Sequence, residues 1–111
     1  MIEIDENKIF VSGKEIEFDF FILKYIMYGD LVIILLDIPK DVNQYNNLYA
    51  VNSTTGKIYW EVEDLKNYLD NPTPYHSLEL MNNNISVWDW YGWQYFISPD
   101  TGEIIFRRLV K

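Results

Sequence analysis

The chain has 111 residues, of which 49% are hydrophobic and 17% aromatic. It is therefore too apolar for a disordered segment, and we expect a single domain over residues 1–111. Its 17 acidic and nine basic residues give a net charge of −8, which argues against nucleic acid and anionic membranes as partners and favours a basic protein. The absence of cysteine excludes disulfides and thiolate metal sites.

Alternation of apolar and polar residues begins at the N-terminus. Ile2 and Ile4, then Ile9 and Val11, alternate with polar residues, and turn-forming residues that include Gly13 separate these runs. This pattern predicts an N-terminal β-meander. The first residues are acidic, unlike a secretory signal, so we expect a cytoplasmic protein.

The next segment contains the most apolar run. Residues 20–27 are apolar except for Lys24 and suit a strand, with a helix as the alternative. Leu31 to Leu36 is rich in leucine and β-branched residues, which predicts a central strand buried on both faces. The run is too short to span a membrane. Residues 39–47 are polar and predict a surface loop.

A hairpin follows the loop. Residues 48–52 and 57–62 flank a turn that ends in Thr55-Gly56, and glycine tolerates the positive φ that such turns need. Residues 63–71 predict at most one short helix, because Asp64 can cap it and Asn71-Pro72 ends it.

Strand patterns resume after Pro74. Polar turns at 82–84 and 91–92 separate the runs, and a last hairpin turns at Thr101-Gly102. Aligning this turn with Thr55-Gly56 also aligns core-type residues: Tyr49 with Tyr95, Val51 with Ile97, Ile58 with Ile104, and Trp60 with Phe106.

This alignment indicates an internal repeat, approximately 20–62 and 75–110, with four strands in each copy. The fold class predicted is all-β and antiparallel: two four-strand, blade-like units plus the N-terminal meander. We expect a small two-sheet arrangement or one strongly twisted sheet. Two similar hairpins that arose independently are the alternative to a duplication.

Residues 48–52 and 55–60, Leu-Tyr-Ala-Val-Asn and Thr-Gly-Lys-Ile-Tyr-Trp, resemble the blade repeat of quinoprotein-like (PQQ-type) β-propellers. The second copy departs from this repeat, with Glu103 in place of lysine and Phe106 in place of tryptophan. Two such units are too few to close a propeller ring. The cofactor site of that family therefore does not carry over, and we expect no cofactor.

The sequence offers little for catalysis or metal binding. His76 is the only histidine, and the adjacent Ser77 lacks a Gly-x-Ser-x-Gly motif. Asp89, between two tryptophans, is the carboxylate best placed for an apolar setting, but no spacing fixes a second carboxylate beside it. We therefore expect no enzyme and no metal site.

The aromatic run 88–96 is the most unusual local feature. If Ile85 and Val87 are core, alternation exposes Trp88 and Trp90, and exposed tryptophans mark binding surfaces. Acidic residues in the preceding sequence suggest an anionic rim for a basic partner. The candidate binding residues are Trp88, Asp89, Trp90, Tyr91, Trp93, Glu61, Glu63 and Asp64.

Three functions remain open. The first is a non-catalytic protein-binding domain, which by size and acidity looks like the small bacterial immunity proteins that mask a cognate toxin, many of which are basic. The second is a carbohydrate- or small-ligand-binding module that uses the Trp88–Trp93 hairpin. The third is an enzyme with a carboxylate site at Asp89.

Overall fold

The computed structural model describes residues 2–110, which form three antiparallel sheets. The first sheet is the predicted N-terminal meander. Its strands, in the order β1-β2-β3, are β1 (Ile2–Asp5), β2 (Lys8–Val11) and β3 (Lys14–Glu17).

The other two sheets are the two predicted four-strand units. The second sheet has the order β4-β5-β6-β7, with β4 (Ile22–Tyr28), β5 (Leu31–Leu36), β6 (Leu48–Asn52) and β7 (Ile58–Glu61). The third has the order β11-β10-β9-β8, with β8 (Tyr75–Met81), β9 (Asn84–Asp89), β10 (Trp93–Ile97) and β11 (Ile104–Leu109). The all-β prediction is thus confirmed.

Within the segment that had two open alternatives, residues 20–27, residues 22–27 form most of β4, so the strand alternative is correct. Between β7 and β8 lies a single 3₁₀ turn, η1 (Leu65–Asn67), within the range predicted for a short helix. Asp64 caps it as expected, because its side chain accepts a hydrogen bond from the Lys66 amide. None of the helical structure in residues 2–110 is long enough to cross a membrane.

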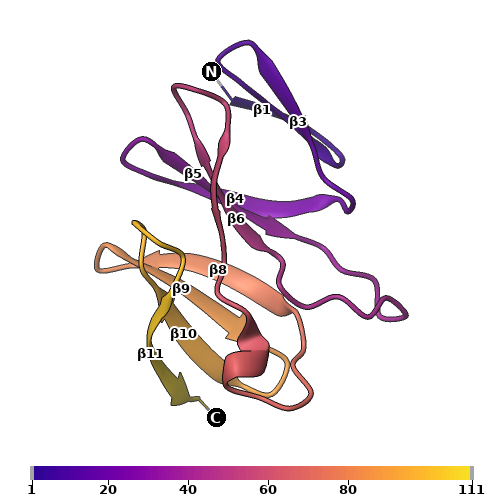
Figure 1. The fold of residues 1–111 in the computed structure, drawn as a ribbon, viewed down its shortest axis with the longest axis vertical. Helices are drawn as coiled ribbons and strands as arrows, with labels where there is room; N and C mark the ends of the chain where they lie inside the picture. The colour runs from indigo at the N-terminus through magenta and orange to yellow at the C-terminus, as the bar shows by residue number, and fades with distance from the viewer. Residues whose placement is uncertain (1, 111) are drawn as a thin grey trace.

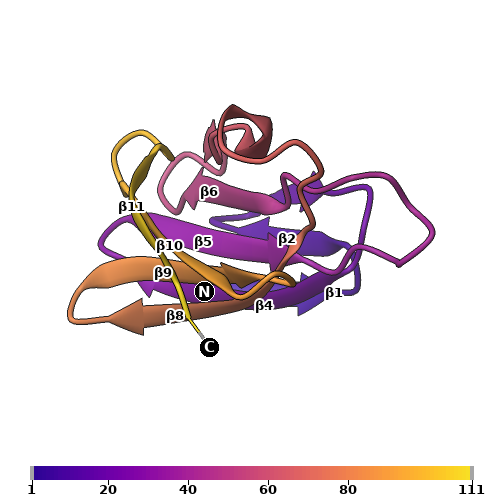
Figure 2. The ribbon, with the colours of Figure 1, turned by 90° about the horizontal axis from the view of Figure 1, so that it is seen from below.

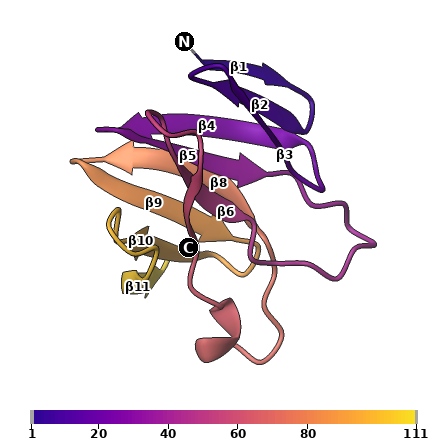
Figure 3. The same ribbon diagram turned by 45° about the horizontal axis from the view of Figure 1, so that its top comes forward.

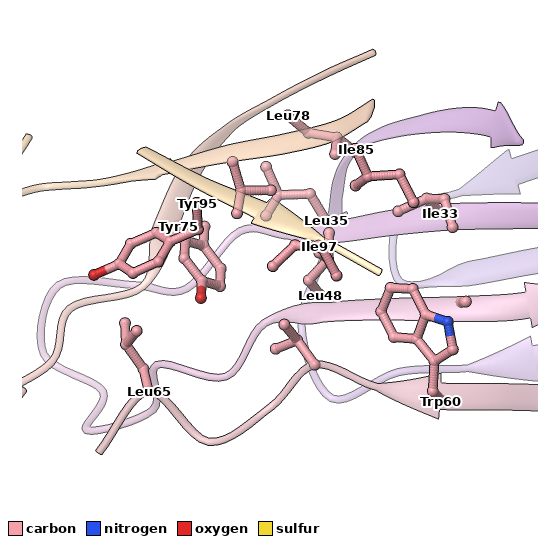
Figure 4. Packing of buried hydrophobic residues seen from close by; sticks show 13 residues of the cluster. Ile33, Leu35, Leu48, Trp60, Leu65, Tyr75, Leu78, Ile85, Tyr95 and Ile97 are labelled. Carbon is pink, nitrogen blue, oxygen red and sulfur yellow. The ribbon is translucent and has the colours of Figure 1, made fainter. Parts of the chain in front are cut away.

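The three sheets are stacked along the long axis of the molecule, with the second sheet in the middle (Figures 1 and 3). Strand β5 explains the stacking, because its side chains alternate between two cores. Val32 and Ile34 pack with residues of the first sheet, whereas Ile33 and Leu35 pack with the third sheet. Figure 4 shows this second core. The meander therefore adds a third layer to the two-sheet or twisted-sheet arrangement that we expected.

The two Thr-Gly hairpins have the same hydrogen-bond pattern. The Gly56 amide donates to the Asn52 carbonyl at 2.8 Å, and the Gly102 amide donates to the Ser98 carbonyl at 2.9 Å. Both glycines have positive φ, at 68° and 79°. The pairing register also shifts at aligned positions before each turn, between Ala50 and Val51 and between Phe96 and Ile97.

Each Thr-Gly turn packs against the last strand of the preceding sheet. Gly102 lies against the indole of Trp60, whose Nε1 donates to the carbonyl of Pro99 at 2.8 Å. In the same way, Gly56 lies against the side chain of Lys14. At the start of β6 and β8, Asn47 joins the second and third sheets by hydrogen bonds to the amide and carbonyl of Tyr75.

Candidate functional site

A groove of about 520 Å³ opens beside Trp90, between the loop after β5 and the segment before β8. A second hollow of about 240 Å³ lies on the His76 side of the same indole. Apolar side chains dominate the first groove, and Asp37 and Lys40 are its charged residues. Its lining is Asp37, Ile38, Pro39, Lys40, Val42, Thr73, Pro74 and Trp90.

The backbone holds Trp90 in a defined position. Its amide donates to Thr73 Oγ1 at 3.1 Å, and the neighbouring Tyr91 hydroxyl donates to the Asn71 carbonyl at 2.7 Å. The indole stacks on the imidazole of His76, with the ring centroids 4.4 Å apart. It is nevertheless 66% exposed. Trp90 is thus a large, fixed apolar group that faces solvent.

Asp89 supports this turn from inside. Its Oδ1 accepts hydrogen bonds from the amides of Tyr91 and Trp93, each at 3.0 Å. Its Oδ2 accepts a hydrogen bond from the Tyr95 hydroxyl at 2.9 Å. The side chain is 1% exposed, so the carboxylate fixes the β9–β10 turn and offers no open face to a substrate.

His76 and Ser77 form a contact that sequence reasoning missed. The His76 Nε2 lies 3.0 Å from the Asp89 carbonyl, which can only accept, so this nitrogen carries a proton. The Nδ1 lies 2.7 Å from the Ser77 hydroxyl. Both ring nitrogens are therefore occupied, which fixes the imidazole beneath Trp90.

The aromatic run does not form one surface, because β9 ends at Asp89 and alternation stops there. Trp90 and Tyr91 lie in the turn, both exposed. Trp88 is half-buried on the sheet face away from Val87. Trp93 packs against the core, and the Arg107 guanidinium lies 4.4 Å from the centroid of its ring.

The three acidic candidates lie outside the lining of the Trp90 groove. Glu61 is exposed on β7, near the Tyr49 hydroxyl. Glu63 accepts from the Ile104 amide at 2.9 Å and so joins η1 to β11. Asp64 caps η1, and the hydrogen bond from the Lys66 amide, with one from Tyr45, holds the pKa of Asp64 below its ordinary value. The acid in the groove is instead Asp37.

Sequence reasoning also missed the apolar part of the groove. Pro39 and Val42 belong to the segment 39–47, predicted only as a surface loop, Ile38 directly precedes it, and Pro74 lies 35 positions after Pro39. The apolar residues within that polar loop were the available signal. Between residues 2 and 110, no three His, Asp or Glu side chains are grouped as a metal site requires.

Comparisons with known proteins agree with the blade-like fold. The family model described as Domain of unknown function (DUF7957) matches residues 1–109. No curated protein matches the sequence. Among solved structures, BamB from Moraxella catarrhalis, a PQQ-like β-propeller, superposes with a TM-score of 0.65 at 13% identity. The computationally designed Ika8 protein superposes with a TM-score of 0.63 at 9% identity.

These likenesses show the blade-like β fold. Both superpositions cover 99% of this chain, but only 33% of BamB and 36% of Ika8. The chain therefore spans about a third of the length of the structures that it matches.

Proposed function

We propose that this chain, which belongs to the DUF7957 family, is a non-catalytic binding domain that takes up an extended segment of a basic partner protein beside Trp90. The observation that carries the proposal is an indole that is 66% exposed on a turn held by hydrogen bonds from the Trp90 amide and the Tyr91 hydroxyl. Tryptophan is over-represented among the residues that dominate binding energy at protein interfaces.

The lining of the groove supports a peptide-like ligand. Ile38, Val42 and two prolines offer apolar contact, while Asp37 offers a partner for a lysine or arginine. The net charge of −8 favours encounter with a basic protein. Because Thr73 and Asn71 already hold the turn, little ordering entropy opposes binding there.

A peptide-display selection tests the proposal. A random peptide library is selected on the wild-type chain after depletion on the Trp90→Ala variant. We expect enriched peptides with a hydrophobic residue next to lysine or arginine, which bind Trp90→Ala at least about tenfold more weakly. Acrylamide quenching of tryptophan fluorescence provides a second readout, because a bound peptide shields the most exposed indole.

The control variant is Tyr59→Ala, which removes an aromatic side chain that is 53% exposed on β7, outside the groove. It should bind the selected peptides as the wild type does. If the selection yields no peptide that depends on Trp90, or if Tyr59→Ala is equally impaired, the proposed site is wrong.

Within this proposal, the finer hypothesis is an immunity protein that acts in the cytoplasm and masks a basic bacterial toxin. Its support is the small size and acidity of the chain. Co-expression with the protein encoded immediately upstream tests it. We expect a co-purifying complex that suppresses toxicity and is weakened by Trp90→Ala. An unrelated, non-toxic neighbour removes this hypothesis but leaves the groove proposal standing.

The second candidate is a carbohydrate-binding module. The exposed indole of Trp90 favours it, since a flat aromatic ring in a groove can stack on a sugar. A glycan array separates the two functions: binding to glycans that is lost in Trp90→Ala supports the module, and an array without binding leaves the protein-binding proposal.

A further inference from the structure

The third sheet has an outer face, which points away from the second sheet. In the second sheet, the equivalent face is covered, because the third sheet packs on it. Pairing across β8–β11 forms one row of Glu79, Ser86, Phe96 and Phe106 and a second row of Ser77, Trp88, Gln94 and Arg108. The Glu79 carboxylate is already paired with Lys24 of β4, at 3.4 Å. The corresponding rows of the second sheet, by pairing and by the Thr-Gly alignment, are Ile33, Ala50 and Trp60, and Leu35 with Leu48. All five of these second-sheet residues belong to the core shared with the third sheet.

The difference in exposure is large at the aligned aromatic position. Trp60 is 7% exposed because the Thr-Gly turn of the third sheet covers it, whereas Phe106 is 56% exposed. Phe106 packs beside Phe96, with ring centroids 5.7 Å apart. The third sheet thus presents an ordered aromatic surface where another sheet would pack.

A hydrogen-bonded chain of polar side chains orders this face. Gln94 Nε2 donates to Ser86 Oγ at 2.7 Å, and Arg108 Nε donates to Gln94 Oε1 at 2.7 Å. The guanidinium of Arg108 also lies 6.0 Å from the centroid of the Phe96 ring. Arg108 therefore holds a positive charge in a defined position among the aromatic rings.

The outer face of the first sheet has the opposite charge. Its inward residues, which include Ile9 and Val11, are buried against the second sheet, so the alternate positions point outward. One outward row is Glu3, Phe10 and Glu15, and the other is Asp5, Lys8 and Glu17. Four carboxylates and one lysine thus surround a half-buried phenylalanine.

We propose that the outer face of the third sheet binds the outer face of the first sheet of a second copy of this chain, in a head-to-tail contact. Arg108 then meets the carboxylates around Phe10, while the phenylalanines of the two faces pack together. The stacking that already joins the three sheets continues from one copy to the next. The two faces lie at opposite ends of the long axis in Figure 1, and Figure 2 views the molecule from the end that carries the third sheet.

Sedimentation velocity over a concentration series tests this contact, and the geometry makes it a heterologous one. We expect the wild-type chain to form oligomers whose dissociation constant rises with salt. Arg108→Glu should raise that constant at least about tenfold, and so should the double variant Glu3→Lys/Glu15→Lys. A chain with all three substitutions should associate again, because the charges on both faces are exchanged.

Phe106→Ala and Phe21→Ala form a matched pair, since Phe21 is 58% exposed but lies in the connection between β3 and β4, outside the rows of both faces. Only Phe106→Ala should weaken association. Circular dichroism checks that each variant is folded, and Trp90→Ala should associate normally, which separates this contact from the proposed function.

A wild-type chain that stays monomeric at millimolar concentration overturns the proposal. So does an oligomer that Arg108→Glu disrupts and the triple variant fails to restore, since that result indicates contact between two copies of the same face.

Discussion

Two tyrosines at the interface of the second and third sheets differ in their hydrogen bonding. Tyr75 and Tyr95 are both buried, and their rings meet edge to face with centroids 5.4 Å apart. The Tyr95 hydroxyl donates to Asp89, whereas within residues 2–110 the Tyr75 hydroxyl has no hydrogen-bond partner. We therefore expect the Tyr95 hydroxyl to stabilise the fold and the Tyr75 hydroxyl to add nothing or to destabilise it.

Replacing each tyrosine with phenylalanine tests this difference. Tyr95→Phe leaves a buried carboxylate oxygen without a donor and should lower the free energy of unfolding by about 1–3 kcal/mol. Tyr75→Phe removes an unpaired hydroxyl and should leave that free energy unchanged or raise it. Urea denaturation measures both variants, and an equal loss in the two would contradict the hydrogen-bond assignment.

At the candidate site, the sequence predicted the exposed residue but not the residues that surround it. The sequence identified Trp90 as exposed from alternation, which holds only up to Asp89, where β9 ends. The side chain is exposed because it lies in a turn. The partners that complete the groove, Ile38, Pro39 and Pro74, come from two other connections, and spacing along the chain carries no information about which loops meet.

At the scale of elements, the Thr-Gly turns join one sheet to the next. A Cβ on Gly102 would lie 2.7 Å from an atom of the Trp60 ring, well inside van der Waals contact. Gly13 in the β2–β3 turn has a similar φ of 74° but no neighbouring atom within 4 Å. The two glycines thus share a backbone requirement and differ in packing.

Alanine substitution at both glycines should separate the two effects. Gly13→Ala should cost about 1–2 kcal/mol, the strain of a left-handed conformation. Gly102→Ala should cost at least about 1 kcal/mol more, because the Trp60 indole must move. Thermal unfolding measures both losses. Equal losses would mean that the turn does not depend on its contact with Trp60.

Local signals predicted the strands well and their layering poorly. Glycine and asparagine turns, together with alternation, located the hairpins, and the apolar run of β5 indicated a strand covered on both sides. Alternation does not say what covers each face. The sequence therefore predicted the N-terminal meander but not that it forms a third layer.

For the whole molecule, two buried tyrosines should lower the stability of the fold at high pH. Burial is the main cause that raises the pKa of both Tyr75 and Tyr95 above the ordinary value of 10.0, and Asp89 raises it further. Because the folded state disfavours the tyrosinate form, this contribution to stability is complete below about pH 10 and is lost as the pH rises above it.

Urea denaturation at about pH 8 and about pH 11 checks this direction, with absorbance at 295 nm reporting tyrosine ionisation. We expect a lower midpoint at the higher pH and ionisation of the buried tyrosines together with unfolding. Ionisation of all nine tyrosines with the fold intact would contradict the burial of Tyr75 and Tyr95.

The whole molecule combines an acidic, three-layer β scaffold with one fixed, exposed tryptophan beside an apolar groove. The central claim is that this groove binds a segment of a basic partner. Isothermal titration of one display-selected peptide into the wild-type chain, Trp90→Ala and Tyr59→Ala tests it most directly. The account predicts matching affinities for the wild type and Tyr59→Ala and at least about tenfold weaker binding for Trp90→Ala; equal affinity for all three chains would contradict it.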